Sequence, residues 1–89
     1  MTQVVVTHAV GDMNKWLAGG ANRTAVFSKF SSGHRIFRHA DGKRISIILD
    51  DVDLDKMQST LSTPETAAAK KVDTVVDPIE VYIEVPGGK

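Results

Sequence analysis

The amino-acid sequence predicts an α+β fold whose elements follow the order strand, helix, strand, strand, helix, strand. Three observations carry this prediction. A β-branched run opens the chain, an Asp-Gly pair interrupts a second apolar region, and an alternating apolar segment lies near the end. Stretches with helical spacing separate these strands. The 89 residues are few enough that we expect one domain, residues 1–89.

The first strand is expected over residues 2–9, where nearly continuous apolar character favours burial on both faces. Asp12 is suited to cap the helix that follows. Apolar positions then recur at helical spacing, namely Met13, Trp16, Leu17, Ala21, Thr24 and Phe27. The pair Gly19-Gly20 interrupts them, and each glycine costs about 1 kcal/mol in a helix interior. Either the helix kinks there or another group approaches its backbone closely; we predict one helix ending near Phe30.

The middle of the chain is expected to form a β-hairpin. Asp41-Gly42 suits a two-residue type I′ turn, because both central positions need positive φ. That turn pairs Ile36 with Ile47 and His34 with Leu49. The face expected to pack on helices carries Ile36, Ile45, Ile47 and Leu49. The opposite face carries Arg35, Phe37, His39, Arg44, Ser46 and Ile48.

The second half repeats the pattern of helix and strand. Asp53 is expected to cap a helix with Leu54, Met57 and Leu61 on one side. Thr63-Pro64-Glu65 has the signature of a further helix start, and that helix continues through residues 67–72. Asp77-Pro78 is expected to break the chain before a last strand. In that strand Ile79, Val81, Ile83 and Val85 should point inward, opposite Glu80, Tyr82 and Glu84. Residues 86–89 are expected to be a frayed tail.

This element order is the split βαβ, or ferredoxin-like, arrangement βαββαβ. It gives a four-stranded antiparallel sheet with helices on one face. The other face holds Phe37, Ile48 and Tyr82 without a cover, and an exposed apolar face of this kind usually marks an interface. We therefore predict a homodimer through the helix-free sheet face, which would also enlarge a small core.

Composition excludes several classes of protein. Eleven basic and eleven acidic side chains cancel, which argues against nucleic-acid binding. The absence of cysteine removes disulfides, Fe–S clusters, thiolate zinc sites and thiol catalysis. No apolar run approaches the roughly 20 residues of a membrane span, and no signal peptide is visible. We expect a soluble cytoplasmic domain without a nucleic-acid or membrane partner.

His8, Val10, Asp12 and Trp16 form a His-x-Val-x-Asp-x-x-x-Trp pattern. It resembles the start of small bacterial dimeric α+β barrel proteins, and the similarity continues through the Asp-Gly hairpin, residues 61–65 and residues 78–82. Relatives with known chemistry include antibiotic-biosynthesis-type monooxygenases, which oxidise polycyclic phenols without metal or flavin, and muconolactone-isomerase-type enzymes. The resemblance implies a dimeric α+β barrel, no cofactor and a pocket between sheet and helices. Catalytic residues differ among these relatives, so no mechanism carries over.

His8 is the candidate catalytic residue, because imidazole exchanges protons near neutral pH. The equally weighted alternative is a histidine hydrogen-bonded to the backbone at a strand end. Trp16 is a candidate wall for an aromatic ligand, although a helix tryptophan is more often core. Met13, Phe27 and Met57 would complete that wall. Tyr82 is a candidate hydrogen-bond donor to the ligand, or alternatively an interface residue.

A metal site is not expected. His34 and His39 are five residues apart in one strand, so their side chains point to opposite faces. The acidic run at residues 50–55 lacks the glycine and terminal glutamate of a calcium loop. Arg35, Arg38, Lys43 and Arg44 make the hairpin basic and could attract an anionic ligand, although a solvated hairpin tip is the interpretation we favour.

Two functions from different classes remain. The first is a cofactor-free enzyme, monooxygenase-like or isomerase-like, that binds a small hydrophobic or aromatic metabolite. The second is a non-catalytic binding or assembly module, which predicts a dry, filled space around Trp16 and no ligand-sized cavity. An RNA-recognition domain shares the element order, but residues 45–49 offer no aromatic side chain for base stacking.

Overall fold

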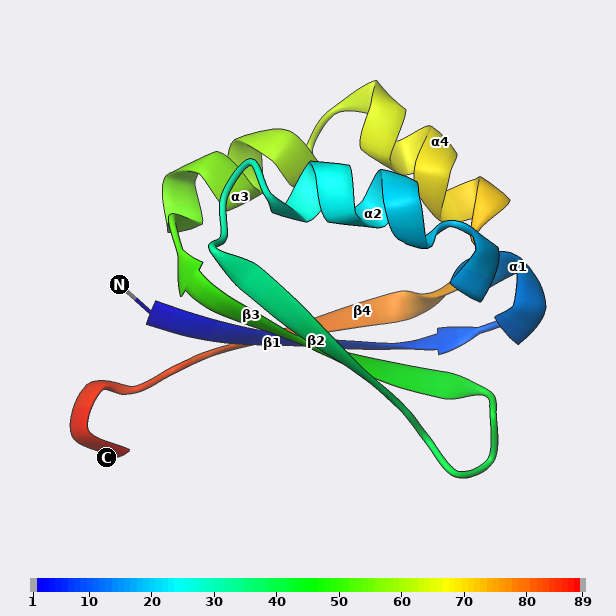
Figure 1. Cartoon of the computed structure of the whole chain (residues 1–89), viewed down its shortest axis with the longest axis horizontal. Helices are drawn as coiled ribbons and strands as arrows, with labels where there is room; N and C mark the ends of the chain where they lie inside the picture. The colour runs from blue at the N-terminus through cyan, green and yellow to red at the C-terminus, as the bar shows by residue number, and fades with distance from the viewer. Residues whose placement is uncertain (1, 89) are drawn as a thin grey trace.

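Four antiparallel strands form one sheet, and all the long helices cover the same face of it (Figure 1). The computed structural model describes residues 2–88. Its elements are β1 (Thr2–Val10), α1 (Met13–Ala18), α2 (Gly20–Phe27), β2 (Gly33–Arg38), β3 (Arg44–Val52), α3 (Leu54–Leu61), α4 (Pro64–Val72), β4 (Val75–Ile83) and a final 3₁₀ turn, η1 (Pro86–Gly88). The predicted α+β class and ferredoxin-like order are confirmed. The tail expected to fray holds η1, and Lys89 lies outside the described residues.

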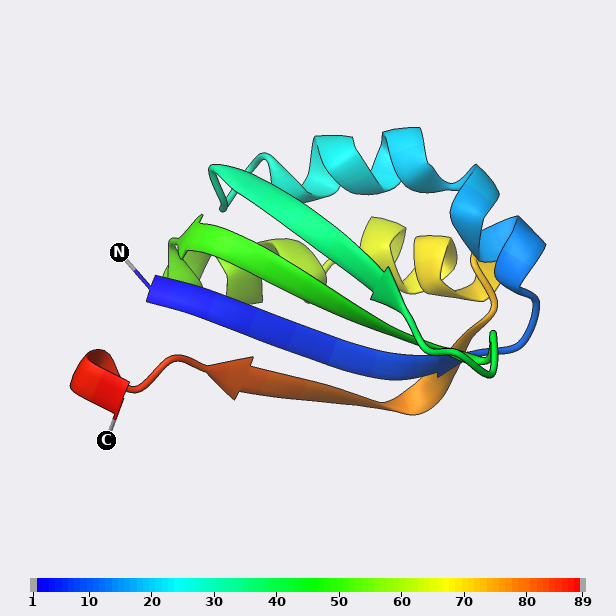
Figure 2. The ribbon, with the colours of Figure 1, turned by 60° about the horizontal axis from the view of Figure 1, so that its bottom comes forward.

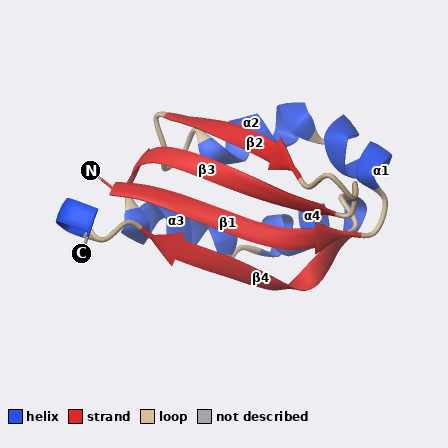
Figure 3. Cartoon of the chain, turned by 90° about the horizontal axis from the view of Figure 1, so that it is seen from below, coloured by secondary structure: helices blue, strands red, loops and turns tan. Residues whose placement is uncertain are grey.

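The strand order is β2-β3-β1-β4, which Figure 3 shows from the face without helices. β3 pairs antiparallel with both β1 and β2, so β1 and β2 run in the same direction with β3 between them. This is the split βαβ arrangement. β4 pairs antiparallel with the other edge of β1. The two central strands, β1 and β3, therefore hold the residues with the most neighbours.

The hairpin between β2 and β3 has the predicted register but another turn. Ile36 pairs with Ile47, and His34 with Leu49, as predicted. The His39 N–H donates to Arg44 O at 2.8 Å, and the Gly42 N–H donates to His39 O at 2.9 Å. Only Gly42 has positive φ in this turn, at 72°. The type I′ turn is thus wrong, since it needs positive φ at Asp41 as well.

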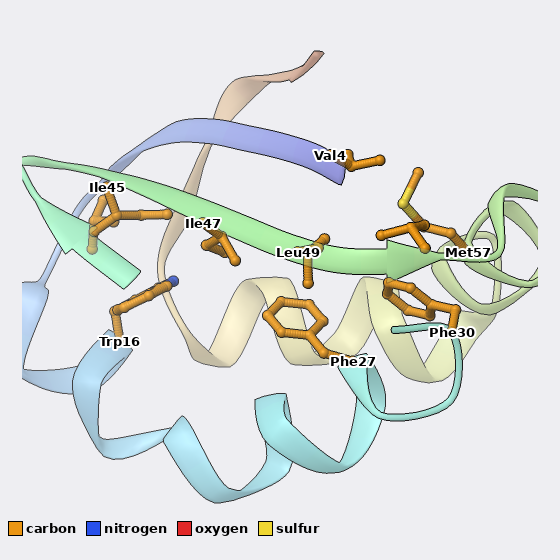
Figure 4. Packing of buried hydrophobic residues seen from close by; sticks show 10 residues of the cluster. Val4, Trp16, Phe27, Phe30, Ile45, Ile47, Leu49 and Met57 are labelled. Atoms are coloured by element: carbon orange, nitrogen blue, oxygen red, sulfur yellow. The ribbon is translucent and has the colours of Figure 1, made fainter. Parts of the chain in front are cut away.

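The core lies between the sheet and the helices (Figure 4). From the sheet it takes Val4, Val10, Ile45, Ile47, Leu49 and Val52, and from the helices and their connections Trp16, Phe27, Phe30 and Met57. The inward placement of Ile45, Ile47 and Leu49 is confirmed. Ile36 stays 37% exposed because it lies on the edge strand β2.

The first helical region consists of two helices, where we predicted one. α1 ends at Ala18, α2 begins at Gly20 and ends at Phe27, and Gly19 lies between them (Figure 2). Arg23 is buried on the same side as Trp16 and Phe27, whereas Leu17 is 49% exposed. The predicted apolar stripe therefore holds at Trp16 and Phe27 but not at Leu17.

The predicted caps are confirmed at all three helix starts. The Asp12 carboxylate accepts from the Lys15 N–H at 3.2 Å, and the Asp53 carboxylate accepts from the Lys56 N–H at 3.1 Å. The Thr63 hydroxyl accepts from the Thr66 N–H at 3.2 Å, with Pro64 at the first helical position. Each cap satisfies a backbone donor that the helix itself leaves free.

The last strand begins earlier than predicted and passes through Asp77-Pro78. Thr7 pairs with Glu80 and Ala9 with Val76, so residues 77–79 stand opposite His8 alone. This bulge accommodates a proline because β4 is an edge strand. The expected inward burial of Val81 and Ile83 is wrong. They face the helix side, but at the edge they remain 45% and 51% exposed, and Val85 lies beyond the strand at 54%.

The face without helices carries exposed apolar side chains in this chain. Phe37 is 53% exposed and Tyr82 is 54% exposed, while Ile48 between them is half-buried. Val5 pairs with both Ile48 and Tyr82, which places these residues on one surface. We call this surface the open face; it comprises Val5, Thr7, Arg35, Phe37, Arg44, Ser46, Ile48, Glu80 and Tyr82. Among the described residues, no helix has the length and apolar character that a membrane crossing needs.

Candidate functional site

A hollow of about 610 Å³ crosses the sheet at the end where the hairpin turns. All four strands contribute to it, since its lining is Thr7, His8, Ala9, Phe37, Arg38, His39, Arg44, Ile45, Ser46, Val76, Asp77, Pro78, Glu80 and Tyr82. Phe37 and Ser46 are register partners, as are Thr7 and Glu80. These pairs belong to the open face. The hollow therefore lies largely on the side away from the helices, whereas the family resemblance implied a pocket between sheet and helices.

His8 lines this hollow from the central strand β1 and is only 8% exposed. Its Nδ1 atom lies 2.8 Å from Ala9 O. A carbonyl oxygen only accepts, so Nδ1 carries the hydrogen and Nε2 carries the free lone pair. Within residues 2–88, every fully buried side-chain nitrogen or oxygen has a hydrogen-bond partner, and none is recorded for Nε2. It follows that Nε2 retains access to solvent.

Burial lowers the pKa of His8 below its ordinary value of 6.5. The Arg23 guanidinium lowers this pKa further, whereas the hydrogen bond to Ala9 O and the charges of Asp73 and Asp77 raise it. The net effect favours the neutral ring at pH 7. A neutral imidazole with a free Nε2 acts as a proton acceptor. The backbone hydrogen bond of the alternative interpretation is thus present, and a catalytic role for His8 stays a prediction.

Trp16 lies behind His8 in the core and does not line the hollow. It is 1% exposed, and its ring centre lies 6.1 Å from that of His8 in an edge-to-face arrangement. The Arg23 guanidinium carbon lies 3.5 Å from the centre of the indole ring. The space around Trp16 is thus filled by protein side chains.

The other predicted wall residues also belong to the core. Phe27 and Met57 are 9% and 8% exposed, and Met13 packs against the same cluster. None of them lines this hollow or a second, shallower one, which lies between the start of β1 and the start of α3. The structure thus brings His8 and Tyr82 to one hollow and places Met13, Trp16, Phe27 and Met57 elsewhere. Ligand contact by those four stays a prediction.

Tyr82 and Phe37 give the hollow aromatic surface. The Tyr82 hydroxyl donates to Glu80 Oε2 at 3.2 Å, and this carboxylate raises the pKa of Tyr82. The hydroxyl therefore stays protonated at neutral pH and keeps its capacity to donate. Both rings are about half exposed, so each offers apolar area to a ligand or to another protein surface.

Charges divide the hollow into two sides. Arg38, His39 and Arg44 come from the hairpin strands and their turn, whereas Asp77 and Glu80 come from β4. His39 Nδ1 lies 3.1 Å from an Asp41 carboxylate oxygen, so that ring is engaged within the hairpin. His34 instead meets Phe27 edge-on, with ring centres 5.2 Å apart. Across the described part of the chain, no three metal-binding side chains lie close enough to share an ion.

Sequence reasoning missed Arg23 and Asp73. Their side chains are buried to 7% and 17% exposure and form an ion pair at 3.0 Å. Arg23 stands seven residues after Trp16, and residues at this spacing lie on the same face of a helix. This spacing could have indicated that Arg23 lies beside Trp16. Asp73 is 50 residues from Arg23, so no local spacing could have paired the two.

Neither a protein-family model nor a curated protein matches the chain. Several solved structures do match the chain. A protein provisionally named an antibiotic biosynthesis monooxygenase, from Bordetella bronchiseptica, has a TM-score of 0.73 at 18% identity, with 94% of each chain covered. A single-substitution variant of SnoaB, a cofactor-independent oxygenase from Streptomyces nogalater, has a TM-score of 0.64 at 19% identity, covering 97% of this chain and 91% of that one.

Rv0793 from Mycobacterium tuberculosis has a TM-score of 0.58 at 13% identity, covering 97% of this chain and 95% of that one. At these identities the similarity shows the fold. It confirms the predicted resemblance in architecture to antibiotic biosynthesis monooxygenases over nearly the whole chain.

Proposed function

We propose that the protein binds a small hydrophobic or aromatic molecule in the hollow beside His8 and transforms it without a cofactor. The observations that support this proposal are a buried, neutral His8 whose Nε2 has no protein partner and a hollow whose lining includes His8, Phe37 and Tyr82. The shared fold with a cofactor-independent oxygenase supports it. Monooxygenase-like and isomerase-like reactions are the two classes that fit.

Proton removal is the step that these residues support. Nε2 of His8 accepts a proton from a phenol O–H or from a C–H next to a carbonyl group. The resulting anion is electron-rich, which suits reaction with dioxygen, and it can also be reprotonated elsewhere, which moves a double bond. Phe37 and Tyr82 would flank the ring of the ligand, and the Tyr82 hydroxyl would donate to an oxygen of the ligand in place of Glu80.

The homodimer through the open face is part of the same proposal. Phe37, Ile48 and Tyr82 leave apolar area uncovered on the surface that also holds the hollow. A second copy seated there would cover this area and enclose the ligand. Light scattering at micromolar concentration tests this point, because a stable monomer would contradict it.

A ligand screen with a turnover assay tests the function. Phenols, aromatic acids and lactones are screened by thermal shift, since a ligand at 100 times its Kd stabilises by about 2.7 kcal/mol. Each hit is then assayed for product and for dioxygen uptake, with His8→Gln as the variant and His34→Gln as the control. We expect His8→Gln to abolish turnover, whereas His34 lies outside the hollow. Full turnover by a folded His8→Gln protein would overturn the role of His8.

The second candidate is a non-catalytic binding or assembly module. One observation favours it, namely the filled space around Trp16. It predicts ligand binding without any product, or oligomerisation without any ligand. The same screen separates the two candidates.

A further inference from the structure

Arg23 is a buried cation with an unusually complete set of partners. Its side chain is 7% exposed and its guanidinium lies over the Trp16 indole, 3.5 Å from the ring centre. Nη2 donates to the Trp16 carbonyl oxygen and to Asp73 Oδ2, the latter at 3.0 Å. Burying this charge carries a desolvation cost that only well-placed partners offset. The arrangement therefore fixes the Trp16 ring between a cation and the sheet.

Gly19 permits this arrangement. A Cβ atom at this position would lie 2.5 Å from Asp73 Oδ1, well inside contact distance. The turn that carries Asp73 is held by Thr74, whose carbonyl oxygen accepts from the Gly11 N–H at 2.8 Å. The Thr74 hydroxyl accepts from the Asp12 N–H at 2.8 Å. The ends of β1 and α4 and the junction of α1 with α2 thus meet at one corner.

The His8 ring meets Trp16 edge-on, with centres 6.1 Å apart, while Arg23, Trp16 and Asp73 stay outside the lining of the hollow. We propose that Arg23 and Asp73 are positioning residues for His8, which they act on through the Trp16 indole so that the imidazole ring keeps its orientation. This inference rests on the proposed function of His8.

Arg23 and Asp73 carry opposite charges, so removing each one should shift the pKa of His8 in a different direction. Arg23 lowers the pKa of His8, whereas Asp73 raises it, as does Asp77 on β4. Arg38, His39, Arg44 and Glu80 are the other titratable or charged side chains in the lining of the hollow. A purely structural role for the pair would change stability without moving the His8 titration in two directions.

The experiment is a pH titration of the histidine ring signals by NMR in four proteins: wild type, Arg23→Met, Asp73→Asn and Arg35→Met. Arg35 is the matched control, because it pairs with Asp50 at 3.8 Å and is 59% exposed. We expect Arg23→Met to raise the pKa of His8 and Asp73→Asn to lower it, because each variant removes one of two opposing charges. Arg35→Met should leave it unchanged. An unchanged His8 titration in both variants would overturn the inference.

A further variant keeps the test valid if Arg23→Met does not fold. Arg23→Lys keeps the charge but loses the planar, forked donor. We expect the pKa of His8 to stay near that of wild type while the Trp16 indole N–H and His8 ring signals shift. Unshifted signals would contradict positioning through the indole. Loss of turnover in Arg23→Lys but not in His34→Gln supports the inference, whereas full turnover in His8→Gln contradicts the proposed function instead.

Discussion

The two faces of the sheet are built from alternate residues of the same strands, yet they differ sharply. On the covered face Val4, Ile47 and Leu49 are at most 3% exposed. On the open face Phe37 and Tyr82 are more than half exposed. The difference arises because every long helix packs on one side (Figure 1). Buried apolar contacts are therefore concentrated on the covered face, whereas charged and aromatic side chains line the hollow at the open face.

The largest expected effect is the difference in unfolding free energy between a substitution on the covered face and one on the open face. Leu49→Ala removes a side chain that is 1% exposed, and it should lower the free energy of unfolding by about 2–5 kcal/mol. Phe37→Ala should cost a folded monomer less than about 1 kcal/mol, because its ring is already half in water. Urea denaturation of both variants gives the comparison. A loss at Phe37 that grows with protein concentration would instead show that a second copy covers the open face.

The next largest effect on stability is expected where α1 meets α2, and it is tested by comparing substitutions at two adjacent glycines. Gly19→Ala places a methyl group against the Asp73 carboxylate, and the strain and weakened ion pair should cost about 1–3 kcal/mol. Gly20→Ala meets nothing within 4 Å and stands at the start of α2. It should stabilise by about 0.4–1 kcal/mol. Thermal unfolding of the two variants checks the opposite signs, and equal melting temperatures would contradict the close packing at Gly19.

His8 belongs to both regions, since it is buried beside the core and lines the hollow. The pKa of its ring is lower in the folded chain than the ordinary 6.5 expected when unfolded. Between these two values the unfolded state binds more protons, so stability should fall as the pH drops below about 6.5. His8→Gln should flatten this dependence relative to wild type. Urea midpoints at pH 5 and pH 7.5 measure it, and an unchanged slope in His8→Gln would contradict the buried neutral ring.

Local patterns predicted most of the fold but only half of the site. The caps at Asp12, Asp53 and Thr63 and the hairpin register depend on residues close in sequence, so spacing alone located them. The His8 prediction also came from a local strand end. The hollow depends on how four strands come together, and the Arg23–Asp73 pair joins residues 50 positions apart. The close approach that Gly19-Gly20 suggested is made by Asp73 at Gly19, but the sequence could not name a partner so far along the chain.

The smallest change in stability is expected at the Arg35–Asp50 pair on the open side of the sheet, in contrast to the buried Arg23–Asp73 pair on the helix side. Arg35 and Asp50 on the open side are 3.8 Å apart, with side chains 59% and 34% exposed. Water screens this pair, and Asp50 has a second partner in the Gln3 amide at 2.7 Å. Arg35→Ala should therefore change the free energy of unfolding by less than about 0.5 kcal/mol, and added salt should remove even that difference. Urea denaturation at low and high salt measures both quantities. A loss above about 1 kcal/mol that persists in high salt would mean that the pair is shielded from water, as it would be if another copy of the chain covered the open face.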